Sequence, residues 1–136
     1  MFIFHLKFIF VTLLYNPMSI KLNTNIVKNL NQNDISSYLK DINKFPLLSH
    51  EEEYSLADTW IKDKCLNAAH KLINAHLRLV VKISMKFRGY GLPLGELISE
   101  GNIGLIQSLN RFDPKRGFRL STYAMWWIRA SIQEFI

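Results

Sequence analysis

The sequence predicts an all-α protein, a helical bundle of about five helices. Its apolar residues recur at steps of three and four over several long segments, which is the spacing of one face of an α-helix. No segment shows the strict alternation of a half-buried strand. Hydrophobic residues make up 49% of the 136 residues and aromatic residues 12%, which is enough for one modest core. We expect one helical domain over residues 34–136, preceded by a flexible segment over residues 1–33.

The N-terminal segment Met1–Tyr15 is almost wholly apolar, interrupted only by His5, Lys7 and Thr12. It is shorter than the roughly 20 apolar residues that a membrane span needs. Lys7 lies within the run rather than ahead of it, which disfavours a secretory signal. We therefore expect a cytoplasmic protein without stable membrane association. Because a polar composition begins at Met18, residues 1–17 could also precede the true start of translation, which terminal mass analysis would test.

The first helix follows a lead-in rich in Asn and Lys, residues 19–33. Asn33 or Asp34 is expected to cap it, and apolar residues follow at helical spacing as far as Ile42. Phe45-Pro46 then ends it, because the residue before a proline disfavours the helical conformation.

The second helix is predicted to begin after Ser49 and to end near Lys64. Ser49 and Glu52, three residues later, form the pattern of a capping box. Glu51, Glu52 and Glu53 suit the positive end of the helix dipole. We expect this acidic run to cap the helix and to be solvated.

Two longer helices are predicted next, over Leu66–Arg88 and over roughly Leu94–Arg111. Gly89, Gly91 and Pro93 separate them, because glycine and proline end helices.

Two glycines, Gly101 and Gly104, lie inside the second of these long helices. Each costs ~1 kcal/mol relative to Ala at such a position, so we expect another helix to approach closely there. Asp113–Gly117 is predicted to form a turn. Ser121 or Thr122 is then expected to cap a last helix that continues to the end of the chain.

Charge and cysteine content narrow the classes of function. A net charge of +6 and a pI near 9.6 favour a polyanionic partner, either nucleic acid or an anionic membrane. Cys65 is the only cysteine, so no intrachain disulfide and no thiolate metal site can form. We expect Cys65 to be a small buried helix residue.

No catalytic or cofactor-binding pattern is present. The four histidines lack metal-ligand spacing with each other or with acids, and the sequence has no phosphate-binding glycine loop and no nucleophile elbow. Glu96, Glu100 and Asn102 could suggest acid-base chemistry, but carboxylates four apart on a helix more often form a partner-facing or solvated surface. We expect no enzyme activity, no metal and no cofactor.

The most informative segment is Gly117–Gln133, in which a basic turn precedes a helix with adjacent tryptophans. One helical face is shared by Trp126, Arg129, Ala130 and Gln133, and an adjoining strip by Tyr123 and Trp127. Aromatic rings beside cations can stack unpaired bases, at ~1 to 3 kcal/mol per base. Burial of both indoles in the core is the alternative.

Four cations surround these aromatic residues: Lys115, Arg116, Arg119 and Arg129. They lie at a turn and near a helix start, where they could meet phosphates. A merely solvated basic face is the alternative. Together with the aromatic residues, they favour binding of open DNA.

Several segments together resemble the conserved second region of bacterial RNA polymerase sigma factors. They are 76–81 (HLRLVV), 88–93 (RGYGLP), 97–105 (LISEGNIGL), 111–117 (RFDPKRG) and 121–129 (STYAMWWIR). Upstream, 38–42 (YLKDI) and 45–54 (FPLLSHEEEY) resemble the short helical region that precedes it. The sequence of residues 118–134 (FRLSTYAMWWIRASIQE) is closest to that of the heat-shock type of sigma factor. The resemblance covers roughly residues 34–136.

The resemblance implies a non-enzymatic helical domain that docks on a coiled coil of the largest subunit of core RNA polymerase and opens promoters at the minus-ten element. By motif match, the positions that contact this coiled coil are Leu77, Glu96, Ser99, Glu100, Asn102 and Ile106. Gly101 and Gly104 would give access to a groove that binds a helix.

The resemblance also implies a site for promoter DNA, chiefly its non-template single strand. Tyr123 falls where the family stacks a flipped adenine, and Trp126 with Trp127 where it wedges against the remaining duplex. The expected DNA-binding residues are Lys115, Arg116, Phe118, Arg119, Leu120, Thr122, Tyr123, Trp126, Trp127, Arg129, Ala130 and Gln133.

Two of these positions depart from the housekeeping pattern. Leu120 stands where those members carry an aromatic residue, and Ala130 where they carry a glutamine, so recognition of the upstream end of the element should differ. Our hypothesis is that Gln133 contributes there instead.

The resemblance further implies that the chain stops within the helix that reads the minus-ten element, so we expect a truncated or split sigma factor. Three readings stay open: a fragment that binds core polymerase and melts promoters, a polymerase-binding decoy or inactive remnant, and, more distantly, a membrane-surface protein built on Met1–Tyr15. Transcription in vitro with core polymerase separates the first two.

Overall fold

The computed structural model describes residues 32–136, with side chains from residue 35 onward. These residues form five α-helices and one 3-10 turn, without a strand, which confirms the all-α prediction. The elements are α2 (Gln32–Ile42), α3 (His50–Asp63), α4 (Leu66–Met85), α5 (Leu94–Arg111), η2 (Pro114–Arg116) and α6 (Leu120–Phe135). The predictions for Met1–Tyr15, for a start at Met18 and for the lead-in as far as residue 31 lie outside the described residues.

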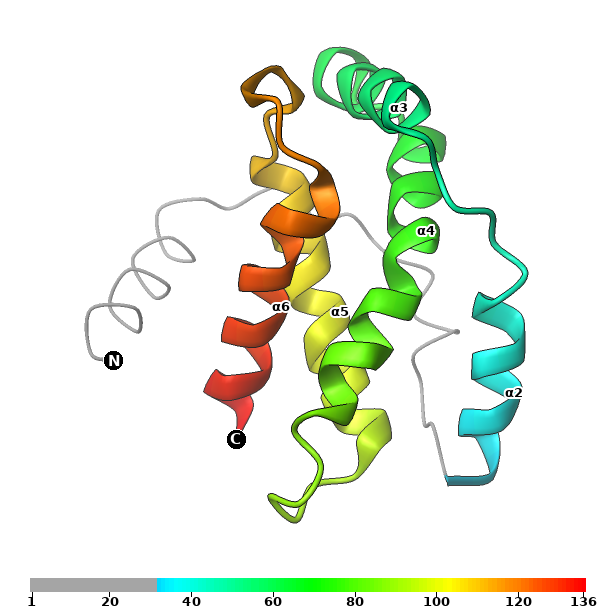
Figure 1. The fold of residues 1–136 in the computed structure, drawn as a ribbon, viewed down its shortest axis with the longest axis vertical. Helices are drawn as coiled ribbons and strands as arrows, with labels where there is room; N and C mark the ends of the chain where they lie inside the picture. Colours follow the sequence, from blue (N-terminus) through cyan, green and yellow to red (C-terminus); the bar gives the residue numbers. More distant parts are fainter. Residues whose placement is uncertain (1–31) are drawn as a thin grey trace.

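The helices pack around a central trio (Figure 1). α5 and α6 lie side by side and antiparallel, joined through η2, and α4 packs against both. α3 packs on α4 at the end where η2 lies, and α2 lies along the outer side of α4. Every helix contributes to one core, through Ile42, Ala57, Leu72, Leu105 and Ile128 among others. Within residues 32–136, no helix is both long and apolar enough to cross a bilayer.

The two interior glycines explain how closely α5 and α6 approach. A Cβ atom on Gly104 would lie 2.5 Å from the backbone oxygen of Trp127 and 2.9 Å from the Cα atom of Ile128. A Cβ atom on Gly101 would lie 2.7 Å from Cγ1 of Val80 on α4. The predicted close helix approach is therefore confirmed. Both glycines are buried inside the bundle, so the expectation that they open a groove for an outside helix is wrong.

The cap of α3 follows the sequence, but the expectation that Asn33 or Asp34 caps α2 is wrong, since α2 begins at Gln32. Ser49 accepts a hydrogen bond from the N–H of Glu52, whose carboxylate accepts one from the N–H of Ser49, so the predicted capping box is confirmed. Lys64 ends α3 in the left-handed conformation, with φ of 50°. α4 ends at Met85, three residues before the predicted end, because the chain tightens into turns that lead to Gly89, whose φ is 100°.

The later elements agree with the sequence except at one cap. α5 has the predicted bounds, and Asp113 caps the turn that Gly117 closes with φ of 83°. The expectation that Ser121 or Thr122 caps the last helix is wrong, since α6 begins at Leu120 and its N-cap residue, Arg119, makes no side-chain cap. A residue from another helix supplies the missing acceptor.

Candidate nucleic-acid and protein interfaces

Glu53 of α3 supplies the acceptor at the start of α6. Its Oε2 atom accepts hydrogen bonds from the backbone N–H of Leu120 and from Nε of Arg119, both at 3.1 Å. The Glu53 side chain is buried, with 2% of the residue exposed. The expectation that the whole acidic run is solvated is therefore wrong for Glu53. Consecutive helix residues point 100° apart, so Glu53 faces the bundle while Glu51 and Glu52 face solvent.

The partners of Glu53 hold it ionised. Burial alone would raise its pKa, but its contact with His76, the hydrogen bonds from Leu120 and Arg119, and the charge of Arg119 lower the pKa from 4.5 to about 2. Nε2 of the buried His76 lies 3.5 Å from Oε1 of Glu53. Among the described residues, Oε1 has no hydrogen-bond partner of good geometry. The other ring nitrogen, Nδ1, lies 2.6 Å from the carbonyl oxygen of Leu72.

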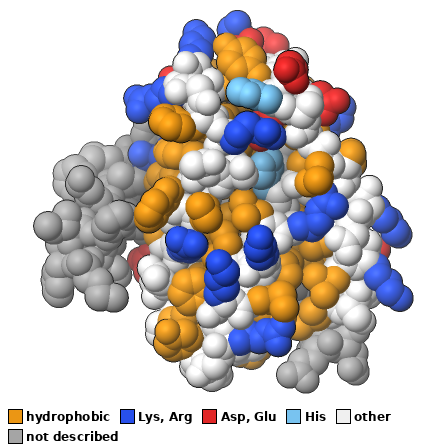
Figure 2. Space-filling view, in the orientation of Figure 1, with side chains coloured by type: hydrophobic (Ala, Val, Ile, Leu, Met, Phe, Trp, Pro, Cys, Tyr) orange, Lys and Arg blue, Asp and Glu red, His pale blue; other side chains and the backbone are white. Residues whose placement is uncertain are grey.

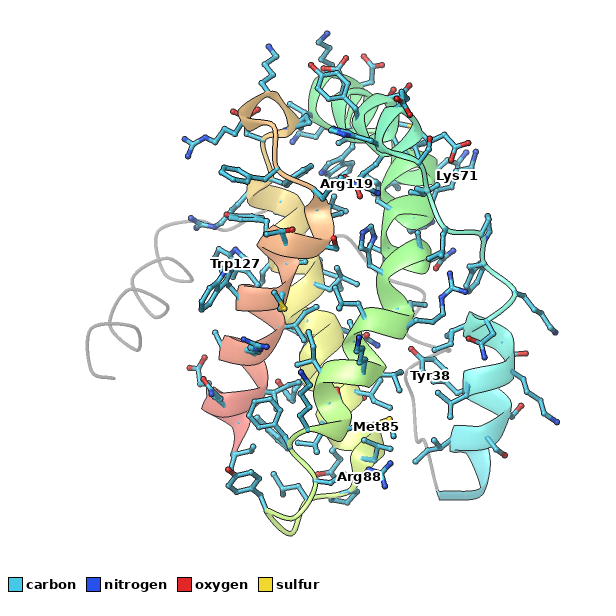
Figure 3. The ribbon with its side chains drawn as sticks, viewed as in Figure 1. Tyr38, Lys71, Met85, Arg88, Arg119 and Trp127 are labelled. Atoms are coloured by element: carbon cyan, nitrogen blue, oxygen red, sulfur yellow. The ribbon has the colours of Figure 1, made fainter. Side chains whose placement is uncertain are left out.

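Arg119 ties the start of α6 to the link between α2 and α3. Besides its ion pair with Glu53, it donates from a terminal guanidinium nitrogen to the carbonyl oxygen of Leu48 at 3.0 Å. Figure 3 shows Arg119 between the start of α6 and α3. This predicted DNA-binding cation is therefore engaged within the protein. Lys115 and Arg116 are exposed on the turn, although Arg116 lies 3.8 Å from Asp113.

The outer face of α6 gathers most of the predicted DNA-binding side chains of that helix. Thr122, Trp126 and Gln133 are exposed there, and Arg129 and Ala130 are half-buried beside them. Trp126 is 61% exposed, so the alternative that both indoles are sealed in the core is wrong. Leu120 differs: it is 0% exposed and belongs to the core. In this structure its side chain offers no surface to DNA.

Tyr123 and Trp127 form a half-buried aromatic row rather than an open platform. Their rings meet edge to face, with centroids 6.2 Å apart, and Tyr123 also packs on Phe112 at 6.0 Å. The guanidinium of Arg111 lies 5.5 Å from the ring centroid of Trp127. Figure 3 shows Trp127 on the outer side of α6. The two rings are therefore packed against each other, Phe112 and Arg111.

A pocket of about 230 Å³ opens beside this row. It is lined by Arg111, Phe112, Asp113, Arg116, Phe118 and Tyr123. The sequence prediction included Arg116, Phe118 and Tyr123 but missed the other three. The segment Arg111-Phe-Asp113 belongs to the motif 111–117 that carries the resemblance, but the prediction did not count these three residues among the DNA-binding ones. Three aromatic walls and two cations around one carboxylate suit a flat, hydrogen-bonding group attached to a phosphate.

Four of the six predicted polymerase-binding residues share one stripe along α5. Glu96 is exposed, and Ser99, Glu100 and Ile106 are half-buried. Ile103 lies on the same stripe, is 46% exposed and was missed by the sequence prediction. Its position three or four residues from Ser99, Glu100 and Ile106 was the available signal. We call Glu96, Ser99, Glu100, Ile103 and Ile106 the α5 stripe.

Leu77 and Asn102 lie elsewhere. Leu77 is 7% exposed and packs in the core, and Asn102 is 4% exposed. Burial raises the pKa of the hydroxyl of Tyr38 on α2, and Asn102 beside it offsets part of this effect. Among the described residues, neither that hydroxyl nor Oδ1 of Asn102 has a hydrogen-bond partner of good geometry. A partner protein could contact Asn102 only if the side chains around Asn102 moved.

The α5 stripe is continued at the end of α6 by a third carboxylate, that of Glu134. The pKa of Glu100 is raised by burial and by the charge of Glu134. A cation brought by a partner would relieve this repulsion. Among the described residues, no group of three or more His, Cys, Asp or Glu side chains is placed to hold a metal ion.

Comparisons with known proteins give a consistent result. Residues 35–60 match the family described as sigma-70 factor, region 1.2, and residues 72–136 match sigma-70 region 2. The chain is 61% identical over 102 residues to RNA polymerase sigma factor RpoH of Caulobacter vibrioides, covering 75% of this chain and 35% of the relative. It is 59% identical to RpoH of Rhizobium radiobacter over 75% of this chain and 34% of the relative. It is 46% identical to RNA polymerase sigma-C factor of Myxococcus xanthus over the same shares. The chain thus spans about a third of the length of these relatives.

Proposed function

The chain belongs to the sigma-70 family of RNA polymerase sigma factors, and from this premise we propose that it binds core RNA polymerase and opens promoter DNA at the minus-ten element. We further propose that it serves promoters of the heat-shock type, which its last helix resembles. Its partners are then core polymerase and the non-template single strand, and no step needs a cofactor.

The pocket beside Tyr123 is the observation that carries the DNA part of this proposal. Its volume of about 230 Å³ is below the ~300 to 1,000 Å³ of sites for drug-sized ligands, which suits one nucleobase. Phe112, Phe118 and Tyr123 provide faces for stacking, and Asp113 provides an acceptor for an amino group of the base. Arg111 and Arg116 stand where a phosphate would follow the base.

Capture of a flipped base in this pocket would drive strand opening. Extruding a base requires a few kcal/mol, and stacking returns ~1 to 3 kcal/mol per base. Trp126 projects from the same helix, one turn further on, and would meet the base pair left behind. The turn cations Lys115 and Arg116 would hold phosphates at the rim. Opening would then proceed from binding energy alone.

The α5 stripe supports the polymerase part of the proposal. It combines the carboxylates of Glu96 and Glu100 with the apolar side chains of Ile103 and Ile106. Such a mixture suits a partner helix that carries cations beside apolar side chains. The stripe lies on α5, and the DNA residues lie on α6 and the turn before it, so both partners could bind at once.

Binding of a single strand tests the pocket directly. A fluorescent minus-ten oligonucleotide carries 2-aminopurine at the adenine that we expect to be flipped. Tyr123→Ala and Phe118→Ala should each weaken its binding about tenfold and abolish the change in 2-aminopurine fluorescence, as the stacking energy implies. Tyr54→Ala is the matched control, since Tyr54 is an exposed tyrosine on α3. Equal binding by all four proteins would refute the pocket.

Transcription in vitro with core polymerase tests the whole function. Promoter-dependent transcripts are expected with the unmodified chain and should be lost with Tyr123→Ala. Binding to core polymerase without promoter-dependent transcripts would instead favour an interaction protein over an initiation factor.

A further inference from the structure

α2 covers the edge of the α5 stripe at Asn102. Asn102 follows Ser99 by three residues and precedes Ile106 by four, so its spacing places it beside the stripe. It is nevertheless only 4% exposed, and Tyr38 of α2 lies beside it. Figure 3 shows Tyr38 on the inner side of α2. The stripe that we assign to the polymerase therefore continues beneath α2.

The contact between α2 and α5 holds two polar groups without good partners. The hydroxyl of Tyr38 and Oδ1 of Asn102 are both buried, and neither has a hydrogen-bond partner of good geometry among the described residues. A buried polar group in this state destabilises the contact that buries it, because water would bond to it when the contact is open. The contact is thus weaker than its apolar area alone would make it.

Few other interactions hold α2 in place. Within residues 35–42, Tyr38 and Ile42 are the buried residues, and no side chain forms an ion pair or a well-formed hydrogen bond to another helix. Figure 2 shows cationic and uncharged polar groups over the right-hand edge of the molecule, where α2 lies. Detachment of α2 would therefore bring few of its apolar side chains into water.

The chain is held in place directly after α2. A terminal guanidinium nitrogen of Arg78 on α4 donates a hydrogen bond to the carbonyl oxygen of Phe45 at 2.8 Å. Asn43 and Lys44 form a turn between this bond and the end of α2. α2 can therefore swing about these two residues while the link to α3 keeps its position.

We propose that core polymerase displaces α2 and binds the surface beneath it, where the side-chain oxygen of Asn102 accepts a hydrogen bond from the partner. The inference rests on the proposed function, in which a partner helix carries cations beside apolar side chains. Such a helix supplies the donor that Oδ1 of Asn102 lacks and an apolar cover for the residues that α2 leaves. In the free protein α2 competes with polymerase, so the apparent affinity scales with the fraction of molecules in which α2 is released.

Two substitutions in α2 that shift this competition in opposite directions test the inference. Tyr38→Phe removes the unpaired hydroxyl and strengthens the docking of α2, so it should weaken binding to core polymerase about fivefold. Ile42→Ala removes a side chain that is 2% exposed, which releases α2, and should tighten binding at least about threefold. Lys40→Gln, at an exposed position of α2, is the matched control and should leave the affinity unchanged. Fluorescence anisotropy of the labelled proteins measures the four affinities.

Hydrogen exchange provides a second readout. Addition of core polymerase should speed amide exchange in residues 35–42 of the unmodified chain and slow it in α5. In the Ile42→Ala background, Asn102→Ala should weaken binding, because α2 is already released and only the bond to the partner is lost.

A helix α2 that only supports the fold would give the opposite pattern. The inference is overturned if Tyr38→Phe binds core polymerase at least as tightly as the unmodified chain does, or if Ile42→Ala binds it more weakly. It is also overturned if exchange of the α2 amides slows or stays unchanged on binding. Failure of both the unmodified chain and Ile42→Ala to bind core polymerase at all would refute the polymerase part of the proposed function, and this inference with it.

Discussion

At the scale of single residues, three consecutive glutamates have three different environments. Glu51 is exposed, Glu52 closes the capping box of its own helix, and Glu53 is buried under the start of α6. All three suit a helix N-terminus, so composition predicted one role for the run. The separate role of Glu53 comes from its direction on the helix and from Arg119, which is 66 residues away in the sequence.

Glu53→Gln should remove a pH-dependent part of the stability. The pKa of Glu53 is lowered from 4.5 to about 2, so its ionised form stabilises the fold above pH 4.5, and this contribution disappears as the pH falls from 4.5 to about 2. The shift corresponds to a free energy on the order of 3 kcal/mol. At neutral pH we expect Glu53→Gln to lower the free energy of unfolding by roughly 2 to 3 kcal/mol, since the amide still accepts from Leu120.

Urea unfolding followed by circular dichroism at a series of pH values measures this effect. As the pH falls from 4.5 to about 2, the free energy of unfolding of the unmodified chain should approach that of Glu53→Gln. Parallel loss of stability in both proteins would show that Glu53 is not the titrating group. Glu51→Gln, at an exposed position of the same run, serves as the control.

At the scale of elements, the contact between α5 and α6 sets the geometry of the proposed DNA face. Tyr123, Trp126 and Trp127 all project from α6, whose backbone lies directly against α5 at Gly104. Any side chain at Gly104 would push α6 outward. Glycine inside a helix is ~1 kcal/mol less favourable than alanine, and close packing of the two helices offsets this destabilisation.

Gly104→Ala should destabilise the protein more than Gly101→Ala does. The new Cβ atom at Gly104 meets backbone of α6, at 2.5 Å from the Trp127 oxygen, whereas at Gly101 its nearest contact is the end of the Val80 side chain, at 2.7 Å. A side chain can turn away, but a helix backbone must shift as a unit. We expect a loss of roughly 2 kcal/mol or more for Gly104→Ala and about 1 kcal/mol for Gly101→Ala.

Thermal or urea unfolding of the two variants decides the order. If Gly104→Ala is as stable as the unmodified chain, the close approach of α5 and α6 is not required in solution. If Gly101→Ala is the more damaging change, the principal contact lies with α4 instead.

At the scale of the whole molecule, the bundle presents two surfaces with opposite chemistry. The turn and α6 present cations and aromatic rings, and the α5 stripe presents carboxylates and isoleucines. The two helices pack on each other through faces that neither surface uses. The fold thereby separates a surface suited to a polyanion from a surface suited to a basic partner.

The two surfaces should respond to mutation independently. Glu96→Gln together with Glu100→Gln should weaken binding to core polymerase at least about tenfold and leave binding to a minus-ten single strand intact. Trp126→Ala should weaken binding to forked DNA and leave binding to core polymerase intact. The folding of this variant should change little because the indole is 61% exposed. Fluorescence anisotropy with labelled protein and labelled DNA measures both affinities. Joint loss of both activities in either variant would contradict separate surfaces.

The sequence by itself determined the helices and predicted part of the candidate site. Periodicity predicted the approximate bounds of α5, the Ser49 and Glu52 pair located the start of α3, and the glycines in α5 required a close neighbour. These features depend on interactions within a few residues or on the absence of a Cβ atom, so the local sequence suffices to specify them. The sequence also placed Trp126 on a helix face with Arg129 and Gln133, but it left burial of the indole open, and the structure decided that Trp126 is exposed.

Only the tertiary structure decided which polar and apolar groups are withdrawn from the surface. It buried Glu53 as the cap of α6, placed Leu120 and Asn102 out of reach, and brought Arg111, Phe112 and Asp113 to the pocket. It also connected Arg78 and Arg119 through one link. Each of these features depends on helices that are far apart in the sequence and that meet at a particular angle. Hydrophobic periodicity specifies which face of a helix points inward, but it does not specify which neighbouring helix that face meets.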